Sequence, residues 1–219
     1  NLGCPFPMIA GKHKGAGMLL YPAQVAEVLA PIAEYPEIQF SLKMRLGWEN
    51  ASECMVLVEL LNTLRLSRIA LHARTGKQQY KGHPDLEAFQ GFYELCQHPL
   101  YYNGDIESLS DIRQILTRFP LLKGVFIGRG LLSSPLLAKE FKGNETFLPE
   151  QRMSIYFAFH EELFSAYSQV LQGETQLLVK MKTLWEYFLP ETDRKLLKRI
   201  KKSTRLQQYT ESVKAIFTS

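Results

Sequence analysis

The sequence is poor in the features that mark secreted, membrane-spanning and zinc-binding proteins. Only three of its 219 residues are cysteine, and Cys4, Cys54 and Cys96 are far apart. This odd, scattered set excludes a disulfide framework, and the lack of a CxxC pair argues against a zinc site. No apolar run is long enough to span a bilayer, and no signal peptide opens the chain. We therefore expect no metal, no membrane association and a reducing, cytoplasmic setting.

The sequence also lacks a strong excess of either charge. It has 26 Lys and Arg against 22 Asp and Glu, a formal net charge of +4, so the balance alone identifies no partner. Hydrophobic residues make up 46%, which is enough to bury a core and argues against disorder. There is no internal repeat and no low-complexity segment. The length suits one large domain, or one domain with a smaller second one.

Strand-like and helix-like segments alternate up to about residue 130. The segments Pro22–Tyr35 and Ala51–Leu64 carry apolar residues at helical spacing. Short apolar segments rich in β-formers predict four strands: Ile38–Met44, Ser67–His72, Leu100–Asn103 and Gly124–Gly128. This alternation predicts an α/β fold of parallel βα units.

The composition changes near Lys142, and no strand pattern follows Pro149. Amphipathic spacing there predicts four helices, which together are typical of a helical bundle. They are Gln151–Leu171, Gln176–Phe188, Thr192–Lys202 and Leu206–Phe217. We therefore predict two domains, residues 1–141 and 149–219.

Polar and glycine residues follow each predicted strand. These are Lys43-Met44-Arg45-Leu46-Gly47, His72-Ala73-Arg74-Thr75-Gly76, Asn103-Gly104-Asp105 and Gly128-Arg129-Gly130. A βα barrel or a doubly wound sheet places its chemistry at the carboxyl ends of its strands. The four segments therefore predict one shared site.

These segments, preceded by Asn1-Leu2-Gly3-Cys4-Pro5 and Gly15-Ala16-Gly17-Met18-Leu19-Leu20, resemble the motifs of the tRNA-dihydrouridine synthase family in order and spacing. The resemblance implies an FMN-binding (β/α)8 TIM barrel followed by a C-terminal helical domain that binds tRNA. It places Asn1 at the end of the fourth barrel strand, so the chain would hold strands five to eight only. The sequence begins without Met, and we expect further residues upstream.

The resemblance assigns Cys4 to catalysis, as the acid that protonates the uracil ring. A thiol, with an ordinary pKa of about 8.5, suits this role because it is neutral at working pH yet can give up its proton. The alternative is a small buried hydrophobic residue, which we favour for Cys54 and Cys96 inside helical segments. Asn1 would hydrogen-bond the uracil edge; the alternative is an ordinary turn residue.

The same resemblance assigns Lys43 and His72 to FMN. Reduced FMN is anionic over its pyrimidine part, and a cation there stabilises it. The alternatives are a solvated strand end for Lys43 and a core histidine for His72. Backbone N–H groups and an arginine after the last two strands would hold the phosphate, the alternative being simple turns. The residues concerned are Asn103, Gly104, Asp105, Gly128 and Arg129.

Two further groups would contact tRNA. By resemblance Arg45, Arg74 and Thr75, with Tyr80, form a polar rim beside the target nucleotide; surface solvation is the alternative. Helical spacing places a basic stripe along one side of the tail, formed by Lys195, Lys198, Arg199 and Lys202. The stripe is either a tRNA phosphate contact or a plain solvated face.

The resemblance implies a flavin-dependent oxidoreductase that reduces a tRNA uridine to 5,6-dihydrouridine with FMN and NADPH, and we expect a monomer. One alternative is a related FMN barrel that acts on a free pyrimidine, as dihydroorotate dehydrogenases do. Another is a non-catalytic RNA-binding remnant, because half a barrel would expose sheet edges.

Overall fold

The structure is a computed structural model that describes residues 1–218. It divides into two compact units, which are described separately. The first comprises residues 1–106 and 110–127, and the second comprises residues 107–109 and the chain from Gly128 onward. This boundary falls earlier than the change in composition near Lys142.

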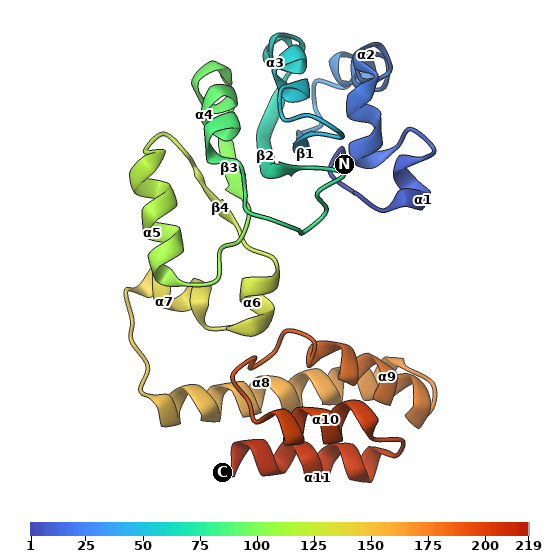
Figure 1. Cartoon of the computed structure of the whole chain (residues 1–219), viewed down its shortest axis with the longest axis vertical. Helices are drawn as coiled ribbons and strands as arrows, with labels where there is room; N and C mark the ends of the chain where they lie inside the picture. Colours follow the sequence, from blue (N-terminus) through green and yellow to red (C-terminus); the bar gives the residue numbers. More distant parts are fainter. Residues whose placement is uncertain (219) are drawn as a thin grey trace. The chain divides into compact units, whose positions relative to one another are not determined.

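The first unit is a single parallel sheet with helices along it (Figure 1). Its strands pair in the order β1-β2-β3-β4, and their bounds are β1 Phe40–Gly47, β2 Leu66–Thr75, β3 Leu100–Asn103 and β4 Gly124–Phe126. The α-helices are α1 Pro7–Ala10, α2 Pro22–Leu29, α3 Glu53–Thr63, α4 Leu86–Leu95 and α5 Leu109–Arg118. Two 3-10 helices are η1 Gly15–Leu20 and η2 Ala30–Glu34.

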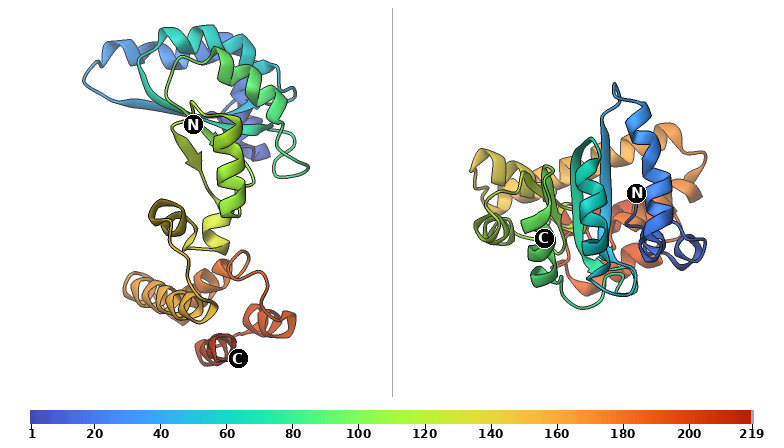
Figure 2. Two further views of the ribbon diagram at one scale, coloured as in Figure 1. Left: turned by 90° about the vertical axis from the view of Figure 1, so that its left-hand side faces the viewer. Right: turned by 90° about the horizontal axis from the view of Figure 1, so that it is seen from above.

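Helices and strands of this unit form an outer and an inner layer (Figure 2). The core lies between them: Met44 of β1 and Leu71 of β2 are fully buried. On β3, the ring of Tyr102 meets Phe89 of α4 edge-on at 5.0 Å. Because side chains alternate along a strand, the residues between these positions lie on the opposite face of the sheet.

The strand register places several polar residues in a row on that opposite face. Arg45 pairs with His72, His72 with Asn103, and Asn103 with Phe126. The first residues of the chain lie beside β1, because Leu2 forms a parallel bridge with Met44 and its N–H donates to the Lys43 carbonyl at 2.8 Å. Cys4 therefore follows a segment that continues the sheet past β1.

The alternation of parallel strands and helices is confirmed, but three predicted strand ends are wrong. β1 continues to Gly47 and β2 to Thr75, so the polar residues expected beyond these strands lie within them. The strands extend because their pairing continues, with Gly47 opposite Thr75 and the Gly76 N–H donating to the Gly47 carbonyl at 2.8 Å. β4 in turn ends at Phe126, ahead of Gly128.

The predicted helix Pro22–Tyr35 is also wrong in its second half. The α-helix ends at Leu29 and the chain continues as the 3-10 helix η2. Pro31 explains the break, because its ring has no N–H to donate and clashes with the carbonyl four residues before it.

The second unit is helical within the residues described, with bounds α6 Arg129–Ser133, α7 Leu137–Gly143, α8 Pro149–Val170, α9 Glu174–Leu184, α10 Arg194–Lys202 and α11 Leu206–Phe217. The predicted helix Leu206–Phe217 is confirmed, whereas α9 ends four residues before Phe188. Helices α8 to α11 share a core around Trp185, Phe188 and Tyr209. No helix among residues 1–218 is both long and apolar enough to cross a membrane.

Candidate active site

Cys4 lies in a segment whose backbone is held on both sides of the thiol. The Gly3 carbonyl accepts a hydrogen bond from Arg45 Nε at 3.1 Å, and the Cys4 carbonyl accepts one from the Ala16 N–H at 3.0 Å. Gly15 packs directly on this turn with a φ of +57°, and a Cβ atom there would lie 2.7 Å from the Cys4 oxygen. Only glycine fits such a close approach. The thiol itself stays half-buried.

Lys43 and His72 lie on the same face of the sheet as Arg45 and Arg74. Burial, and then the charge of Arg45, lower the pKa of Lys43. Burial, and then the charges of Arg45, Lys43 and Arg74, together lower the pKa of His72 to about 3, against the opposing effect of Asp105. His72 is therefore neutral at physiological pH, because three cations surround a group with little access to water.

Arg74 links the ends of β2 and β3. Its guanidinium donates to both carboxylate oxygens of Asp105, one of them at 2.8 Å, and to the Gly82 carbonyl at 2.6 Å. It also donates to Nε2 of His72 at 3.4 Å; because arginine has only donors, this ring nitrogen is the acceptor of a neutral histidine. Arg74 Nε is the one buried side-chain donor in residues 1–218 that has no partner.

Arg45 is buried as deeply as Arg74, each with 1% of its surface exposed. Besides Gly3, it donates to the Thr75 carbonyl at 2.8 Å and to the Gln79 carbonyl at 2.7 Å. Its charge lies 5.5 Å from the centre of the Tyr80 ring, a cation–π contact.

The alternative of surface solvation is wrong for Arg45, Arg74 and Thr75, while their contact with tRNA stays a prediction. The two guanidinium groups satisfy carbonyl and carboxylate oxygens in the interior, and Thr75 is only 8% exposed. Of the predicted rim, Tyr80 alone is exposed. These residues are not solvated because β1 and β2 extend through them, and the carbonyls of Gln79 and Gly82, in the segment that follows β2, accept hydrogen bonds from the two arginines.

Asn103 closes the row of polar residues, and its amide donates to the Phe126 carbonyl at 2.8 Å. Gly104 follows with a φ of +148° and Asp105 with a φ of +38°, so the chain turns sharply after β3. At the other end, the Asn1 side chain accepts a hydrogen bond from the Gly3 N–H at 2.9 Å and so stabilises its own turn. Within residues 1–218, no three His, Cys, Asp or Glu side chains gather as a metal site would need.

The family model described as "Dihydrouridine synthase (Dus)" matches residues 1–218. The chain belongs to the dihydrouridine synthase family. It is 31% identical over 136 residues to a "Probable tRNA-dihydrouridine synthase" of Rhizobium leguminosarum bv. phaseoli, covering 62% of this chain and 43% of the relative. It is 35% identical over 146 residues to another of that name in Aquifex aeolicus, covering 65% of this chain and 45% of the relative.

A third relative is "tRNA-dihydrouridine synthase B" of Vibrio vulnificus, 27% identical over 154 residues, which are 68% of this chain and 48% of the relative. The chain thus spans less than half the length of these curated relatives. The resemblance that the motifs predicted is confirmed at the level of the family.

In this member of the family, Gly128 and Arg129 belong to the second unit. Gly128 precedes the short helix α6, and its carbonyl accepts the Leu131 N–H at 3.1 Å. A Cβ atom at Gly128 would meet no atom within 4 Å. Tight packing therefore does not explain this glycine, and its role in binding phosphate stays a prediction.

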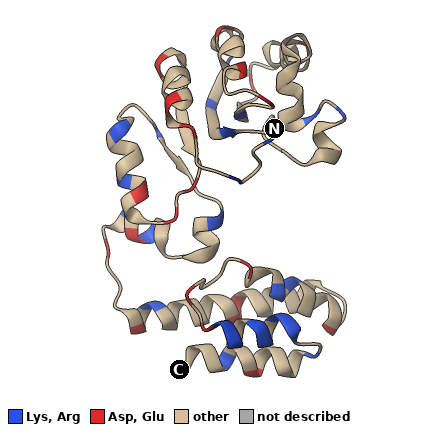
Figure 3. Cartoon of the chain, viewed as in Figure 1, with Lys and Arg blue, Asp and Glu red and all other residues tan. Residues whose placement is uncertain are grey.

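The basic stripe of this family member lies on α10 (Figure 3). Asp193 caps the helix, its side-chain oxygen accepting the N–H groups of Lys195 at 2.8 Å and Leu196 at 3.1 Å. Ile200 anchors the opposite side in the core with no exposed surface.

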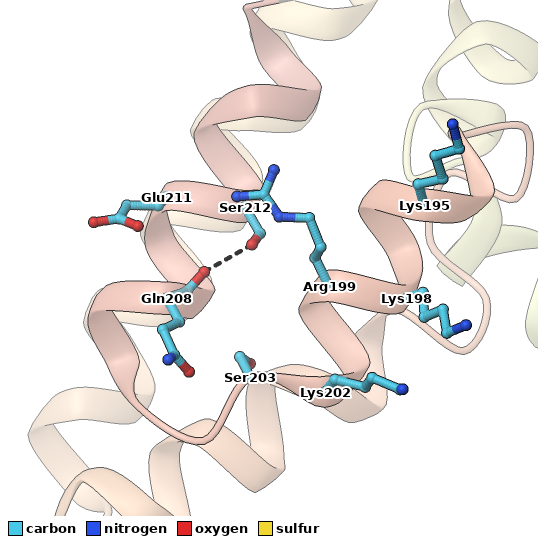
Figure 4. Close-up of a pocket in the computed structure, with 8 residues that line it drawn as sticks. All are labelled: Lys195, Lys198, Arg199, Lys202, Ser203, Gln208, Glu211 and Ser212. Carbon is cyan, nitrogen blue, oxygen red and sulfur yellow. Dashed lines mark hydrogen bonds between the residues drawn. The ribbon is translucent and has the colours of Figure 1, made fainter.

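A groove between α10 and α11 contains all four residues of the stripe (Figure 4). The groove is lined by Lys195, Lys198, Arg199, Lys202, Ser203, Gln208, Glu211 and Ser212. Arg199 extends toward α11, whereas Lys198 and Lys202 point away from it (Figure 4). One helix therefore lines the hollow with four basic residues, of which Arg199 extends toward α11.

Sequence reasoning missed the residues whose carbonyls accept hydrogen bonds from the two buried arginines. Gln79 has a φ of +51° and Gly82 a φ of +63°, and their carbonyls accept from Arg45 and Arg74 respectively. A backbone acceptor leaves no mark in the side-chain pattern, so the only available signal was Gly82 within a polar loop.

The other two cysteines are not at this site. Cys54 of α3 is fully buried, and burial raises the pKa of its thiol to about 12, so it is an inert core residue as predicted. Cys96 lies just beyond α4 rather than inside a helix, and burial raises its pKa as well.

Proposed function

We propose that this chain reduces a uridine of tRNA to 5,6-dihydrouridine, with FMN as its cofactor and NADPH as the reductant. The observation that carries the proposal is the shared face of the sheet in a member of this family: Lys43, His72 and Asn103 lie there, and the Cys4 segment joins it through Arg45. On this proposal the four parallel strands are strands five to eight of a TIM barrel. The helices that follow are then a tRNA-binding domain.

The residues present fit a flavin. A reduced flavin is anionic over its pyrimidine ring, and this face offers the Lys43 ammonium group and the unpartnered Nε donor of Arg74. The neutral His72 adds a ring N–H without a further charge. Asn103, Gly104 and Asp105, with Gly128 and Arg129, remain the candidates for the rest of the flavin and its phosphate.

Cys4 is proposed to supply the proton. When bound, the reduced flavin supplies the hydride that adds to C6 of the uracil ring. The Cys4 thiol gives its proton to C5, the C5–C6 double bond becomes a single bond, and a thiolate is left behind. Burial lowers the pKa of Arg45, whereas the ionised forms of Tyr80 and Cys4 raise it, so the guanidinium of Arg45 interacts favourably with that thiolate.

The groove beside α10 is proposed to bind the tRNA backbone. Its cations, Lys195, Lys198, Arg199 and Lys202, match a row of phosphates, which confer affinity and salt dependence without sequence information. The target uridine has to leave its stack before a catalytic thiol can reach it. Asn1 is the proposed contact to its edge.

Changing Cys4→Ala tests the proposal in the full chain loaded with FMN. Formation of dihydrouridine in unmodified tRNA, followed by mass spectrometry, should fall by about 10²–10⁴-fold, the usual worth of a general acid. Flavin absorbance should be unchanged. Cys96→Ala is the matched control and should retain full activity.

Normal turnover by Cys4→Ala would show that Cys4 is not the acid that protonates the uracil ring. If the unaltered protein reduced free uracil or oxidised dihydroorotate but left every tRNA untouched, the free-pyrimidine alternative would replace the proposal.

A further inference from the structure

We infer that Arg45 is a positioning residue that fixes the Cys4 thiol by holding the carbonyl group of Gly3, an inference that rests on the proposed role of Cys4. Arg45 comes from the middle of β1, and 42 residues separate it from Gly3 in the sequence. Its guanidinium reaches three backbone segments at once, at Gly3, Thr75 and Gln79.

The bond to Gly3 acts on the peptide that precedes Cys4. A peptide group is planar, so fixing the Gly3 oxygen also fixes the nitrogen of Cys4. The next carbonyl, that of Cys4 itself, is fixed by the Ala16 N–H at 3.0 Å, with Gly15 packed against it. Both peptide planes around the thiol are therefore held, which leaves the side-chain torsion of Cys4 as its main freedom.

Direct contact between Arg45 and RNA fits this geometry poorly. Arg45 has 1% of its surface exposed, and its Nε and Nη1 groups already bind backbone carbonyls. A lysine could not replace it, because an ammonium group on a flexible stem lacks the fixed fork of a guanidinium. The arrangement thus requires the shape of arginine as well as its charge.

The test compares Arg45→Gln and Arg45→Lys in the full chain with bound FMN. At saturating tRNA, the rate at which tRNA reoxidises the reduced flavin should fall about 10²-fold in both variants, as expected when a reacting group moves by about 1 Å. The affinity for tRNA should stay unchanged. Arg68→Gln, an exposed arginine of β2, is the control and should retain the rate.

A second measurement does not depend on turnover. Alkylation by iodoacetamide is followed peptide by peptide with mass spectrometry, as the limiting rate constant at high pH, where the thiols are fully ionised and the lost charge of Arg45 does not change the thiolate fraction. This rate constant should become severalfold larger at Cys4 in Arg45→Gln and stay constant at Cys96. If the unaltered protein shows no activity on tRNA, the proposed function fails while this measurement still decides whether Arg45 holds the thiol.

Gly15→Ala disturbs the same turn from the other side without removing a charge, and it should reproduce both effects. It also replaces the Arg45 variants if thermal melting shows that they do not fold. Weakened tRNA binding with an unchanged saturating rate, or full rescue by Arg45→Lys, would overturn the inference. So would unchanged rate and alkylation in Gly15→Ala.

Discussion

At the scale of the residue, the site is a group of cations packed with little water around one neutral histidine. His72 has 6% of its surface exposed, and burial together with the neighbouring cations lowers its pKa to about 3. The unfolded chain would titrate near pH 6.5. Between these two values the unfolded state binds more protons than the folded state, so stability rises with pH.

We predict that His72→Gln flattens the dependence of stability on pH. In the unaltered protein, the contribution of His72 is fully present above pH 6.5 and is lost as the pH falls toward about 3. The loss should be of the order of a few kcal/mol, because each unit of pKa shift corresponds to about 1.4 kcal/mol. Urea unfolding at pH 7.5 and pH 4.5 measures the difference.

His83→Gln is the matched control, since His83 is exposed and should leave the pH dependence as it is. His160 of α8 has a pKa lowered by burial and contributes a slope of its own in every variant. An equal slope in His72→Gln and the unaltered protein would show that His72 is not held neutral.

At the scale of the element, the two sides of α10 have different roles. Few of its residues face the core: Ile200 is buried, and Leu196 and Leu197 are partly buried against the other helices. Its other side carries the basic stripe, and the positive charges in its last turn also complement the negative end of the helix dipole. Folding alone therefore explains part of the charge.

We predict that reversing Lys198, Arg199 and Lys202 to Glu weakens tRNA binding and reduces its salt dependence. Each phosphate that a cation neutralises contributes about 0.7 to 0.9 to the slope of log affinity against log salt. Removing all three cations should thus reduce that slope by about 2, as measured by filter binding between roughly 50 and 200 mM salt.

The control reverses the charges of Arg65, Arg68 and Lys123 by substitution to Glu. These residues are exposed cations near the amino ends of β2 and β4. The net charge changes equally, so an unspecific effect would appear in both triple variants. An unaltered salt slope in the α10 variant would leave the stripe as a solvated face.

At the scale of the whole molecule, two compact units share one chain, and each contains one of the two tryptophans. Trp48 follows β1 in the first unit and packs over Gly76. Trp185 lies in the core of the second unit and donates through its indole N–H to the Tyr209 hydroxyl at 3.0 Å. Separate cores predict separate responses to core mutations.

We predict that, in a Trp48→Phe background, Ile200→Ala shifts the unfolding midpoint seen by tryptophan fluorescence, whereas Phe92→Ala leaves it nearly unchanged. Ile200 and Phe92 are both fully buried, one in each unit. Truncation of either should cost about 2–5 kcal/mol within its own core. Equal shifts from both mutations would show that the two units unfold together.

Much of the fold could be predicted from the sequence, because its signals are local. The 3.6-residue spacing of apolar side chains predicted both ends of α11. The short run of β-forming residues at Leu100–Asn103 likewise predicted β3. Strand ends were less predictable. Arg45 and Thr75 are polar and looked like loop residues, yet both are buried in strands because the interior supplies partners for them.

The sequence by itself determined the parallel βα order, the family motifs and the basic stripe of α10, since each depends on neighbours a few positions apart. Only the tertiary structure decided what the buried arginines do. Arg45 binds oxygens 30 to 42 residues away, and Arg74 binds Asp105 31 residues away. Two of the acceptors of Arg45 are carbonyls of Gly3 and Gln79, and every residue carries a carbonyl, so only the folded chain selects which ones a guanidinium can reach.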